Sequence, residues 1–440
     1  MKSIGIDLGV SFIKIGFLTQ DGLLDVKRVS APIADKDSAW KCELNAEIFV
    51  VLIRELIDEY LQKDAAVDGI YFSTQMHGFV LYNEADSESS PFISWKDRRS
   101  EKYYIAKESI IDYLKRVTPQ DLISKTGMKL RSGLPSVNLF VLQQQGKLSS
   151  RLCFGTIADY VVARLTGTKI STSLTNSAGS GLFDMHKNTW NYELIEYFGI
   201  DVNLPEIKSN RSVVGQYEGV NVYSPIGDQQ AALLGIEEVD YKNTAVSNIA
   251  TGSQVTLVSS KLILSDEFQT RPFIDGTYLL TVPFIPAGRV LSSLVFFLTQ
   301  VSVDLFGYKV SLDETWEKLI QYTQKIDKLE TDLAVNSDFI GSFNRDGGAI
   351  FNINECNFNI KDVLLGFFDD IANNHVKFLK LLSQQRSFEK VILTGGVPQK
   401  IPLLKHLLEA KIEQTVFCSQ IKEDALNGLR CLAFSSIKDW

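Results

Sequence analysis

Several features that define common protein classes are scarce in this chain of 440 residues. Its five cysteines, Cys42, Cys153, Cys356, Cys418 and Cys431, are scattered without short pairing and without zinc-like spacing. This pattern is typical of reduced, mostly buried thiols in a reducing compartment. We therefore expect no disulfide and no structural zinc.

Runs of positive charge and long apolar runs are also lacking. The formal net charge is -8 and no basic tail is present, which argues against nucleic acid or an anionic membrane as a partner. No run approaches the roughly 18 apolar residues of a membrane span, and the opening segment Met1–Asp7 enters a strand pattern at once. We expect neither a signal peptide nor a membrane anchor, and a cytoplasmic protein.

What the chain does have is the composition of an ordinary globular protein, with 45% hydrophobic and 22% charged residues. A chain of this length is too long for one compact core and long enough for two domains. Two domains imply a cleft. Because the chain as a whole is acidic, an anionic ligand bound there would need local hydrogen-bond donors.

The order of periodic segments in the first half predicts an α/β fold. Residues 4–18 alternate apolar with small or polar residues around a turn at Asp7–Ser11, which predicts a β-hairpin. Apolar residues at helical spacing follow at 46–62, and a further strand is expected at 68–73. Strand, helix and strand in this order indicate helices that cover a sheet.

The second half of the chain begins with the same pattern. Residues 243–259 are again two β-rich runs around a small-residue turn, Ala250–Ser253. A helix is expected at 360–382, then a strand and glycine turn at 391–396, and then an apolar helix at 401–408.

The two halves thus look like degenerate copies of one unit, joined without a low-complexity linker. We place the boundary near Ile236, which gives one domain of residues 1–236 and a second domain of residues 237–440. The segment Asp159–Gly167 is best interpreted as a packing helix that ends at a glycine, and we assign it no chemistry.

One carboxylate in the middle of the chain is the candidate for acid–base chemistry. Asp228 lies between the turn residue Gly227 and two amides, Gln229 and Gln230, where the pattern predicts a helix start. An aspartate after glycine is commonly an N-cap that bonds orphan backbone amides. The same carboxylate, held at a cleft, could accept a proton.

Two small-residue turns suit the binding of a phosphate. Asp7, Gly9, Ser11 and Lys14 place an acid at a strand end, followed by backbone amides and a hydroxyl that can face an anion. Each turn, including Ala250–Ser253, also fits an ordinary hairpin. Paired at matching points of two similar halves, they predict a clamp on a nucleotide tail, with Asp7 orienting a hydrated magnesium ion.

Polar and aromatic residues farther along the first half suit a sugar. Gln75 and His77 would lie at the carboxyl end of a strand, the edge where open α/β sheets collect ligands. Trp95 offers an aromatic wall, and Asp97 with Arg98–Arg99 offers partners for vicinal hydroxyls. A structural histidine, and a buried tryptophan beside a solvated charge run, are the alternatives.

A glycine pair in the second half suits a nucleoside. Gly395 and Gly396 precede an expected helix, and the missing side chains would let a base or ribose lie flat against the backbone. A simple strand-to-helix turn needs glycines too, so the pair alone does not decide between the two interpretations.

Taken together and in order, these motifs resemble the FGGY carbohydrate kinases. The motifs span residues 4 to about 408 and are Ile6–Gly9, Gln75–Gly78, Trp95–Arg98, Asp159–Tyr160 with Leu165–Gly167, Gly227–Ala231, Thr251–Gln254 and Gly395–Gly396. The Gln-Met-His-Gly form is most similar to the ketose kinases, xylulokinase and sedoheptulokinase. Arg271–Gly276 followed by Pro286–Arg289 is similar to the sedoheptulokinase-like branch.

The resemblance implies two actin-like, ribonuclease-H-like domains that close over ATP and a sugar, with phosphoryl transfer to a primary hydroxyl. It makes Asp228 the catalytic base and Asp7 the acid linked to Mg2+. The expected sugar contacts are Gln75, Met76, His77, Trp95, Asp97, Asp228 and Gln229. The expected ATP contacts are Gly9, Ser11, Lys14, Thr251, Gly252, Gly288, Gly395 and Gly396.

Three departures from the family pattern bear on ATP binding. Val10 precedes Ser11 where two adjacent hydroxyl residues are common, so only one hydroxyl is present. Ile401 precedes Pro402 where the family often has asparagine, which puts a base or ribose contact in doubt. The second domain is also shorter than is usual for the family.

Other functions fit parts of the same pattern. A pentulose kinase would differ only in the length of its sugar pocket. An actin-like protein that uses ATP to drive a binding cycle would leave the Gln-Met-His-Gly and Trp-Lys-Asp-Arg motifs without a role. A sensor that binds sugar and nucleotide without turnover would fit the departures at Val10 and Ile401. A homodimer is left open.

Overall fold

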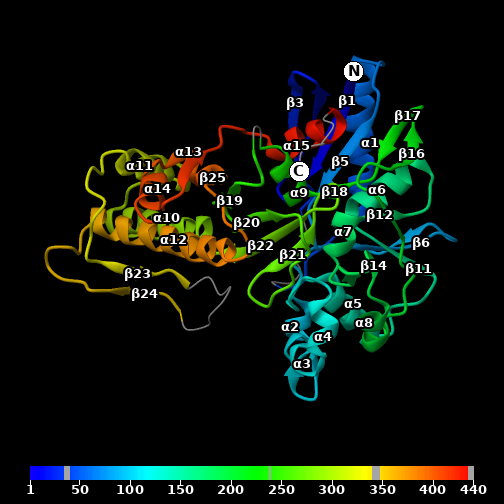
Figure 1. Cartoon of the computed structure of the whole chain (residues 1–440), viewed down its shortest axis with the longest axis horizontal. Coiled ribbons are helices and arrows are strands. Elements are labelled where there is room, and N and C mark those ends of the chain that lie inside the picture. Colours follow the sequence, from blue (N-terminus) through cyan, green and yellow to red (C-terminus); the bar gives the residue numbers. More distant parts are fainter. Residues whose placement is uncertain (34–39, 237–238, 339–346, 435–440) are drawn as a thin grey trace. The chain divides into compact units, whose positions relative to one another are not determined.

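The computed structural model describes residues 1–33, 40–236, 239–338 and 347–434. Contacts within the chain divide it into two units (Figure 1). Unit 1 consists of the described residues within Met1–Glu238, Ser260–Tyr278 and Ile421–Trp440, and unit 2 of those within Val239–Ser259 and Leu279–Gln420. Two segments from the second half of the sequence thus belong to the first unit.

A seven-stranded mixed sheet forms the centre of unit 1. Its strands lie in the order β16 (Val213–Tyr217), β17 (Val220–Tyr223), β5 (Ile70–Thr74), β1 (Lys2–Leu8), β2 (Phe12–Thr19) and β3 (Gly22–Ser30), and the short β18 (Ile226–Gly227) pairs with β5. β1 runs antiparallel to β2 and parallel to β5. The hairpin expected at 4–18 is confirmed, and the strand expected at 68–73 is β5.

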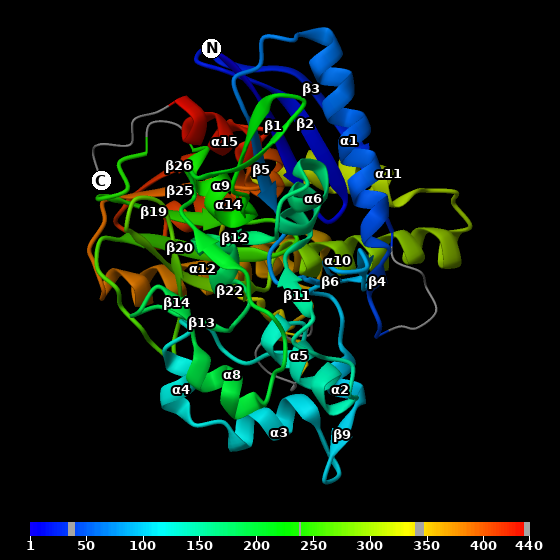
Figure 2. The same ribbon diagram turned by 90° about the vertical axis from the view of Figure 1, so that its right-hand side faces the viewer.

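Helices cover both faces of this sheet (Figures 1 and 2). On one face lie α1 (Ala46–Lys63) and α6 (Ile157–Thr166), and on the other lie α9 (Asp228–Leu234) and α15 (Asp424–Phe434). The apolar positions of α1 face the strands, so that Ile6, Ile15, Phe49 and Ile53 are at most 1% exposed. The expected amphipathic helix over 46–62 is therefore confirmed, and its apolar face packs against the sheet.

The packing helix predicted near Asp159 is α6, and its ends follow from its sequence. Thr156 and Asp159 form a capping box at its start, and Gly167 ends it with a left-handed φ of 66°. Asp159 thus serves the helix terminus, and burial raises its pKa to about 6.

The rest of unit 1 surrounds a second hydrophobic core, which includes Phe79, Leu114, Val137 and Trp190. Its strands are β4 (Glu43–Leu44), β6 (Val80–Asn83), β7 (Glu88–Ser89), β8 (Phe92–Ile93), β9 (Tyr104–Ile105), β10 (Glu108–Ser109), β11 (Leu152–Gly155), β12 (Ser171–Ser173), β13 (Phe183–Asp184), β14 (Thr189–Trp190), β15 (Glu206–Lys208) and β21 (Gln269–Pro272). Its helices are α2 (Arg99–Lys102), α3 (Ile110–Val117), α4 (Gln120–Ser124), α5 (Pro135–Gln144), α7 (Leu174–Ala178) and α8 (Tyr192–Phe198).

Unit 2 repeats the strand pattern of unit 1. Adjacent strands follow the order β22 (Tyr278–Ile285), β20 (Ser253–Ser259), β19 (Thr244–Asn248), β25 (Lys390–Thr394) and β26 (Thr415–Cys418). β19 is antiparallel to β20 and parallel to β25, as β1 is to β2 and β5. The internal repeat expected from the sequence is therefore present in the strand topology.

Helix α12 (Ile360–Ser383) packs against β20 and against α14 (Leu403–Glu409), in agreement with the helices expected at 360–382 and 401–408. The remaining elements of unit 2 are α10 (Gly288–Gln300), the π-helix η1 (Val301–Leu305), α11 (Leu312–Thr323), β23 (Ala334–Asn336), β24 (Ala349–Phe351) and α13 (Gly396–Lys400).

One stretch in the described part of the chain, Gly288–Leu305, is long and apolar enough to cross a membrane by length and composition alone. It comprises α10 and η1, and 33% of it is buried. Core helices of globular proteins pass the same test, so this stretch is weak evidence of a membrane span.

Candidate active site

Asp7 lies near the end of β1, where the hairpin of unit 1 turns. The Ser73 hydroxyl on β5 donates a hydrogen bond of 2.6 Å to Asp7 Oδ1. Lys14 Nζ lies 3.5 Å from Asp7 Oδ2 and 3.0 Å from Glu423 Oε2. Burial raises the pKa of Asp7, whereas Lys14 and Ser73 act to lower it. A hydroxyl and an ammonium group thus hold this carboxylate at the edge of the sheet.

Asp228 is the first residue of α9 and follows β18, which pairs with β5. Gly227 occupies the N-cap position, so the alternative that Asp228 is itself the N-cap is wrong. The half-buried carboxylate of Asp228 accepts a hydrogen bond of 2.8 Å from the backbone N–H of Gln229. Its position at the helix start, as expected, leaves the carboxylate in reach of a ligand.

The charges of Asp7 and Asp228 are coupled. Burial raises the pKa of Asp228 to about 7, and the negative charge of Asp7 adds to the rise. The N–H of Gln229 and the charge of Arg271 act in the opposite direction. A carboxylate whose pKa lies near neutral pH is suited to accept a proton from a substrate.

His77 follows β5 and takes a strained backbone conformation, with φ of 65°. Its Nδ1 lies 2.7 Å from the carbonyl oxygen of Gly179. Burial, together with the charges of Arg131 and Arg271, lowers the pKa of His77 well below its ordinary value. A neutral imidazole that donates from Nδ1 to a carbonyl has Nε2 as an acceptor for a ligand hydroxyl.

Met76, next to His77, is 5% exposed and approaches the start of α9 because two neighbours are glycines. A Cβ atom at Gly227 would lie 2.9 Å from Met76 Sδ, and one at Gly179 would lie 3.1 Å from Met76 Cε. Larger residues at either position would push Met76 away. The segment containing Met76 and the helix carrying Asp228 therefore meet in unit 1.

Gln75 lines a cavity and has a buried side-chain oxygen without a hydrogen-bond partner in the described part of the chain. Its side chain is 3% exposed, and its Oε1 has no hydrogen-bond partner among the described residues. The cavity measures about 410 Å³, and Ser11 and Lys96 also line it. An unpaired buried oxygen costs free energy, so a ligand that donates a hydrogen bond here would be favoured.

Asp97 is fully buried, and its carboxylate is already hydrogen-bonded within the protein. It accepts hydrogen bonds from Arg99 N, Nε and Nη2 and from the backbone N–H of Cys42, at 2.8 to 3.0 Å. These four bonds match the acceptor capacity of a carboxylate. A direct sugar contact by Asp97 stays a prediction, and it would have to displace one of them. Trp95, in the same loop, is half-buried.

One buried side chain at this site, that of Arg271, was not predicted from the sequence. Arg271 lies on β21 and is 5% exposed. Its Nη1 donates to Gln229 Oε1 and lies 3.8 Å from Met76 Sδ, and its Nη2 donates to Gln269 Oε1 at 2.6 Å. The available signal was the Arg-Pro-Phe-Ile-Asp-Gly motif, which the family resemblance picked out without assigning it chemistry.

The turn after β1 carries the remaining ATP contacts expected on unit 1. A Cβ atom at Gly9 would lie 2.7 Å from Phe12 O, so this tight turn requires glycine. Ser11 is exposed, and its carbonyl accepts the backbone N–H of Ala31 at 3.0 Å. The turn therefore presents one hydroxyl, as its sequence implied.

On unit 2, the turn between β19 and β20 meets the start of α10. The N–H of Gly288 donates to Ala250 O at 3.1 Å, and a Cβ at Gly288 would lie only 2.5 Å from that oxygen. The Ser253 hydroxyl also donates to Ala250 O, at 2.8 Å. Thr251 and Gly252, between these anchors, are exposed. Three of the residues expected to contact ATP are thus neighbours.

Gly395 approaches the same turn from the end of β25. It has φ of 91°, and a Cβ there would lie 2.5 Å from Ile249 O. Gly396, the first residue of α13, is exposed, with open space at its Cβ position. Ile401 is 1% exposed, so its side chain belongs to the core. The departure from asparagine at this position therefore serves packing.

The side chains of unit 1 fit a magnesium ion that is held mainly by water and by the phosphates of a bound nucleotide. The described residues contain no cluster of three or more His, Cys, Asp and Glu side chains that could hold a metal. Magnesium, however, usually keeps several waters and binds through one or two carboxylates and substrate phosphates. The single carboxylate of Asp7 meets that smaller requirement.

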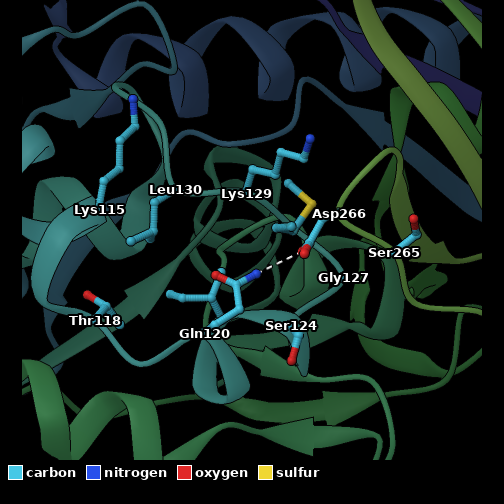
Figure 3. Close-up of a pocket in the computed structure, with 11 residues that line it drawn as sticks. Lys115, Thr118, Gln120, Ser124, Gly127, Lys129, Leu130, Ser265 and Asp266 are labelled. Carbon is cyan, nitrogen blue, oxygen red and sulfur yellow. Dashed lines mark hydrogen bonds between the residues drawn. The ribbon is translucent and has the colours of Figure 1, made fainter.

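A separate cavity of about 340 Å³ in unit 1 contains none of the candidate residues (Figure 3). Lys115 and Lys129 are among the side chains that line it. Gln120 Nε2 donates a hydrogen bond of 2.7 Å to Asp266 Oδ1 across it. This bond helps to fix the segment that contains Asp266, and later Arg271, to unit 1.

The repeated strand pattern and the glycine turns are those of an actin-like ATPase. A solved structure of ligand-bound xylulose kinase from Lactobacillus acidophilus matches with a TM-score of 0.83 at 18% identity, over 98% of this chain and 88% of that one. The predicted α/β fold with two actin-like domains is therefore confirmed.

The family follows from the sequence. The profile described as the FGGY family of carbohydrate kinases, N-terminal domain, matches residues 3–235. Sedoheptulokinase from Mus musculus is 26% identical over 386 residues, 77% of each chain, and xylulose kinase from Staphylococcus xylosus is 25% identical over 58% of this chain and 55% of that one. The chain belongs to the FGGY family of carbohydrate kinases. It is an ATP-dependent phosphotransferase that acts on a sugar hydroxyl.

Proposed function

We propose that this kinase phosphorylates the primary hydroxyl of a ketose, with a sedoheptulose-like sugar favoured and xylulose or another pentulose as the alternative. The Gln-Met-His-Gly motif and the similarity to the mouse sedoheptulokinase support this substrate class. The observation that carries the mechanism is the half-buried carboxylate of Asp228, with a pKa of about 7, beside Asp7 and Gln229.

In this mechanism the sugar lies against unit 1 with its terminal hydroxyl toward Asp228. Nε2 of His77 and Oε1 of Gln75 accept hydrogen bonds from other hydroxyls, and Met76 packs against the carbon chain. Phosphoryl transfer has a loose transition state, so the rate depends mostly on in-line positioning and charge neutralisation. Asp228 takes the proton of the hydroxyl late in the transfer.

The ATP contacts that we propose on each unit are the turns described above. On unit 1 they are Gly9, Ser11 and Lys14, and on unit 2 they are Thr251, Gly252, Gly288, Gly395 and Gly396. Asp7 would hold a magnesium ion through its waters, and the bound ion would neutralise phosphate charge. Lys14, already paired with Asp7, is a further cation for that purpose.

Replacement of the base tests the mechanism. D228N keeps the shape of the side chain and cannot accept the proton, so kcat should fall about 10² to 10⁴-fold with little change in the KM for sugar. The exposed Asp201 supplies the control, since D201N should leave kcat unchanged. Near-normal turnover of D228N would reject Asp228 as the base.

A screen of acceptors tests the substrate class. ADP release and sugar phosphate would be measured with sedoheptulose, xylulose, ribulose, fructose, glycerol and gluconate. We expect the highest kcat/KM with sedoheptulose. A higher value with xylulose or ribulose would establish the pentulose alternative, and a preference for glycerol or gluconate would contradict the ketose assignment.

A further inference from the structure

Arg271 connects parts of unit 1 that lie far apart in the sequence. Its guanidinium group donates to the side-chain amide of Gln229, which directly follows Asp228, and lies 3.8 Å from Met76 Sδ. Its other terminal nitrogen donates to Gln269 Oε1. Both amide acceptors are neutral, so the positive charge of Arg271 is not cancelled by them.

The position of Arg271 is fixed by its neighbours on the chain. The N–H of Thr270 donates to Gly127 O at 2.9 Å, and Gln230 Nε2 donates to Pro272 O at 3.1 Å. These bonds hold the residues on either side of Arg271. A buried guanidinium held in this way places a fixed positive charge beside the start of α9.

Several other charges face Asp228 or its neighbour Asp7. β1 contributes Asp7 itself, and β2 contributes Lys14, which pairs with Asp7. Helix α15 packs against α9. Glu423, which pairs with Lys14, directly precedes this helix, and Asp424, whose pKa burial raises to about 6, is its first residue.

Arg271 opposes this concentration of acids. The negative charge of Asp7 favours the protonated form of Asp228, whereas the positive charge of Arg271 favours the anion. The positive charge of Arg131 repels that of Arg271, and it also disfavours the protonated form of His77. Burial lowers the pKa of Arg271 to about 10, which still leaves it positively charged at neutral pH.

We propose that Arg271 is a positioning residue of this kinase, which orients the side chain of Gln229 toward the sugar. The inference rests on the proposed sugar contact at Gln229. It assigns a function to the Arg-Pro-Phe-Ile-Asp-Gly motif.

Steady-state kinetics at saturating ATP, with the acceptor that gives the highest kcat/KM in the screen, test this role. In R271M the hydrogen bond to Gln229 is lost, so the KM for sugar should rise about tenfold while kcat changes little. Q229A should raise the KM by a similar factor, and R271M combined with Q229A should raise it no further, because Arg271 acts through Gln229. An unchanged KM in R271M, or effects that multiply in the double variant, would overturn the proposal.

A purely structural role would lower stability without this non-additive rise in the KM, so thermal unfolding is recorded for each variant. R271K replaces R271M if the methionine variant does not fold, and because a single ammonium group lacks the fork of two terminal nitrogens, a smaller rise in the KM is expected. Arg116 is 60% exposed at its side chain and paired with Glu108, outside the site, so R116M is the matched control with an unchanged KM.

A binding measurement without ATP distinguishes this inference from the proposed role of Asp228. Calorimetry measures binding of the acceptor chosen by the screen to D228N and to D228N combined with R271M. R271M should weaken this binding by the same factor by which it raises the KM in the active enzyme. If R271M leaves binding unchanged in the D228N background, Arg271 does not orient Gln229, whether or not Asp228 is the base.

Discussion

Ser73 and Asp7 are paired in register on adjacent parallel strands, and the Ser73 hydroxyl donates a hydrogen bond of 2.6 Å to Asp7 Oδ1. Ser73 is 0% and Asp7 5% exposed. Because strand register sets this pair, the orientation of the Asp7 carboxylate is a property of the sheet. A change at Ser73 should therefore act on whatever Asp7 binds.

Replacing Ser73 by alanine should cost about 1.5–3 kcal/mol of unfolding free energy, because a buried carboxylate loses a hydrogen bond. It should also raise the KM for MgATP, since the carboxylate is free to turn toward Lys14. Denaturant unfolding and steady-state kinetics at saturating sugar measure the two effects. S209A, in an exposed turn, is the control and should change neither. If S73A had the same KM for MgATP as the wild type, the orientation of Asp7 would not matter for binding of the metal.

The pKa of Asp228 predicts how activity and stability depend on pH. The proton-accepting form dominates above a pKa of about 7, so kcat/KM should rise through neutral pH and level off above it. The folded state holds the proton more tightly than the unfolded state, whose ordinary value is 3.8. Asp228 therefore lowers the free energy of unfolding progressively as the pH rises from 3.8 to about 7.

It follows that D228N should be more stable than the wild type at pH 8. The gain in unfolding free energy should be on the order of 1 kcal/mol. This is a fraction of what the whole pKa shift would give, because the side chain is only half-buried. The gain should vanish below pH 3.8, the ordinary pKa of the group. Thermal or urea unfolding at pH 4 and pH 8 measures it. If D228N and the wild type had the same unfolding free energy at each of the two pH values, Asp228 would ionise as freely in the folded protein as in the unfolded chain.

Gly395→Ala should weaken ATP binding and destabilise unit 2. The φ of 91° disfavours any side chain, and the added Cβ would lie 2.5 Å from Ile249 O, in the segment that leads into the Thr251 turn. We expect a loss of about 1–3 kcal/mol and a higher KM for ATP. Gly307 has φ of 68° but open space around it, so G307A carries the backbone strain without the collision and should leave the KM for ATP unchanged. A rise in both variants would point to a general loss of stability.

The fold was largely predictable because local patterns decide it. Alternation around small-residue turns predicted both hairpins, and helical spacing predicted α1 and α12. The repeat was visible because both halves use the same order of strands.

The site was only partly predictable, because side-chain partners depend on tertiary contacts. The position of Arg271 beside Gln229 depends on a chain segment returning from the second half, which no local pattern encodes. From their charges alone, Asp97 and Arg99 are an acceptor and a donor suited to sugar hydroxyls, and the contact of Asp97 with a sugar stays a prediction. In the fold they bond each other, and a sequence cannot show which way a charged side chain faces.

The chain passes between the two units four times, at residues 238/239, 259/260, 278/279 and 420/421. A fragment ending at Ile236 would therefore lack both β21 and α15. It would lose the guanidinium beside Gln229 and the helix that donates from Asn427 to Gly235 O at the end of α9. Neither unit can be excised as a contiguous piece of the chain. The ribosome must synthesise α15 before the seven-stranded sheet of unit 1 is covered on both faces.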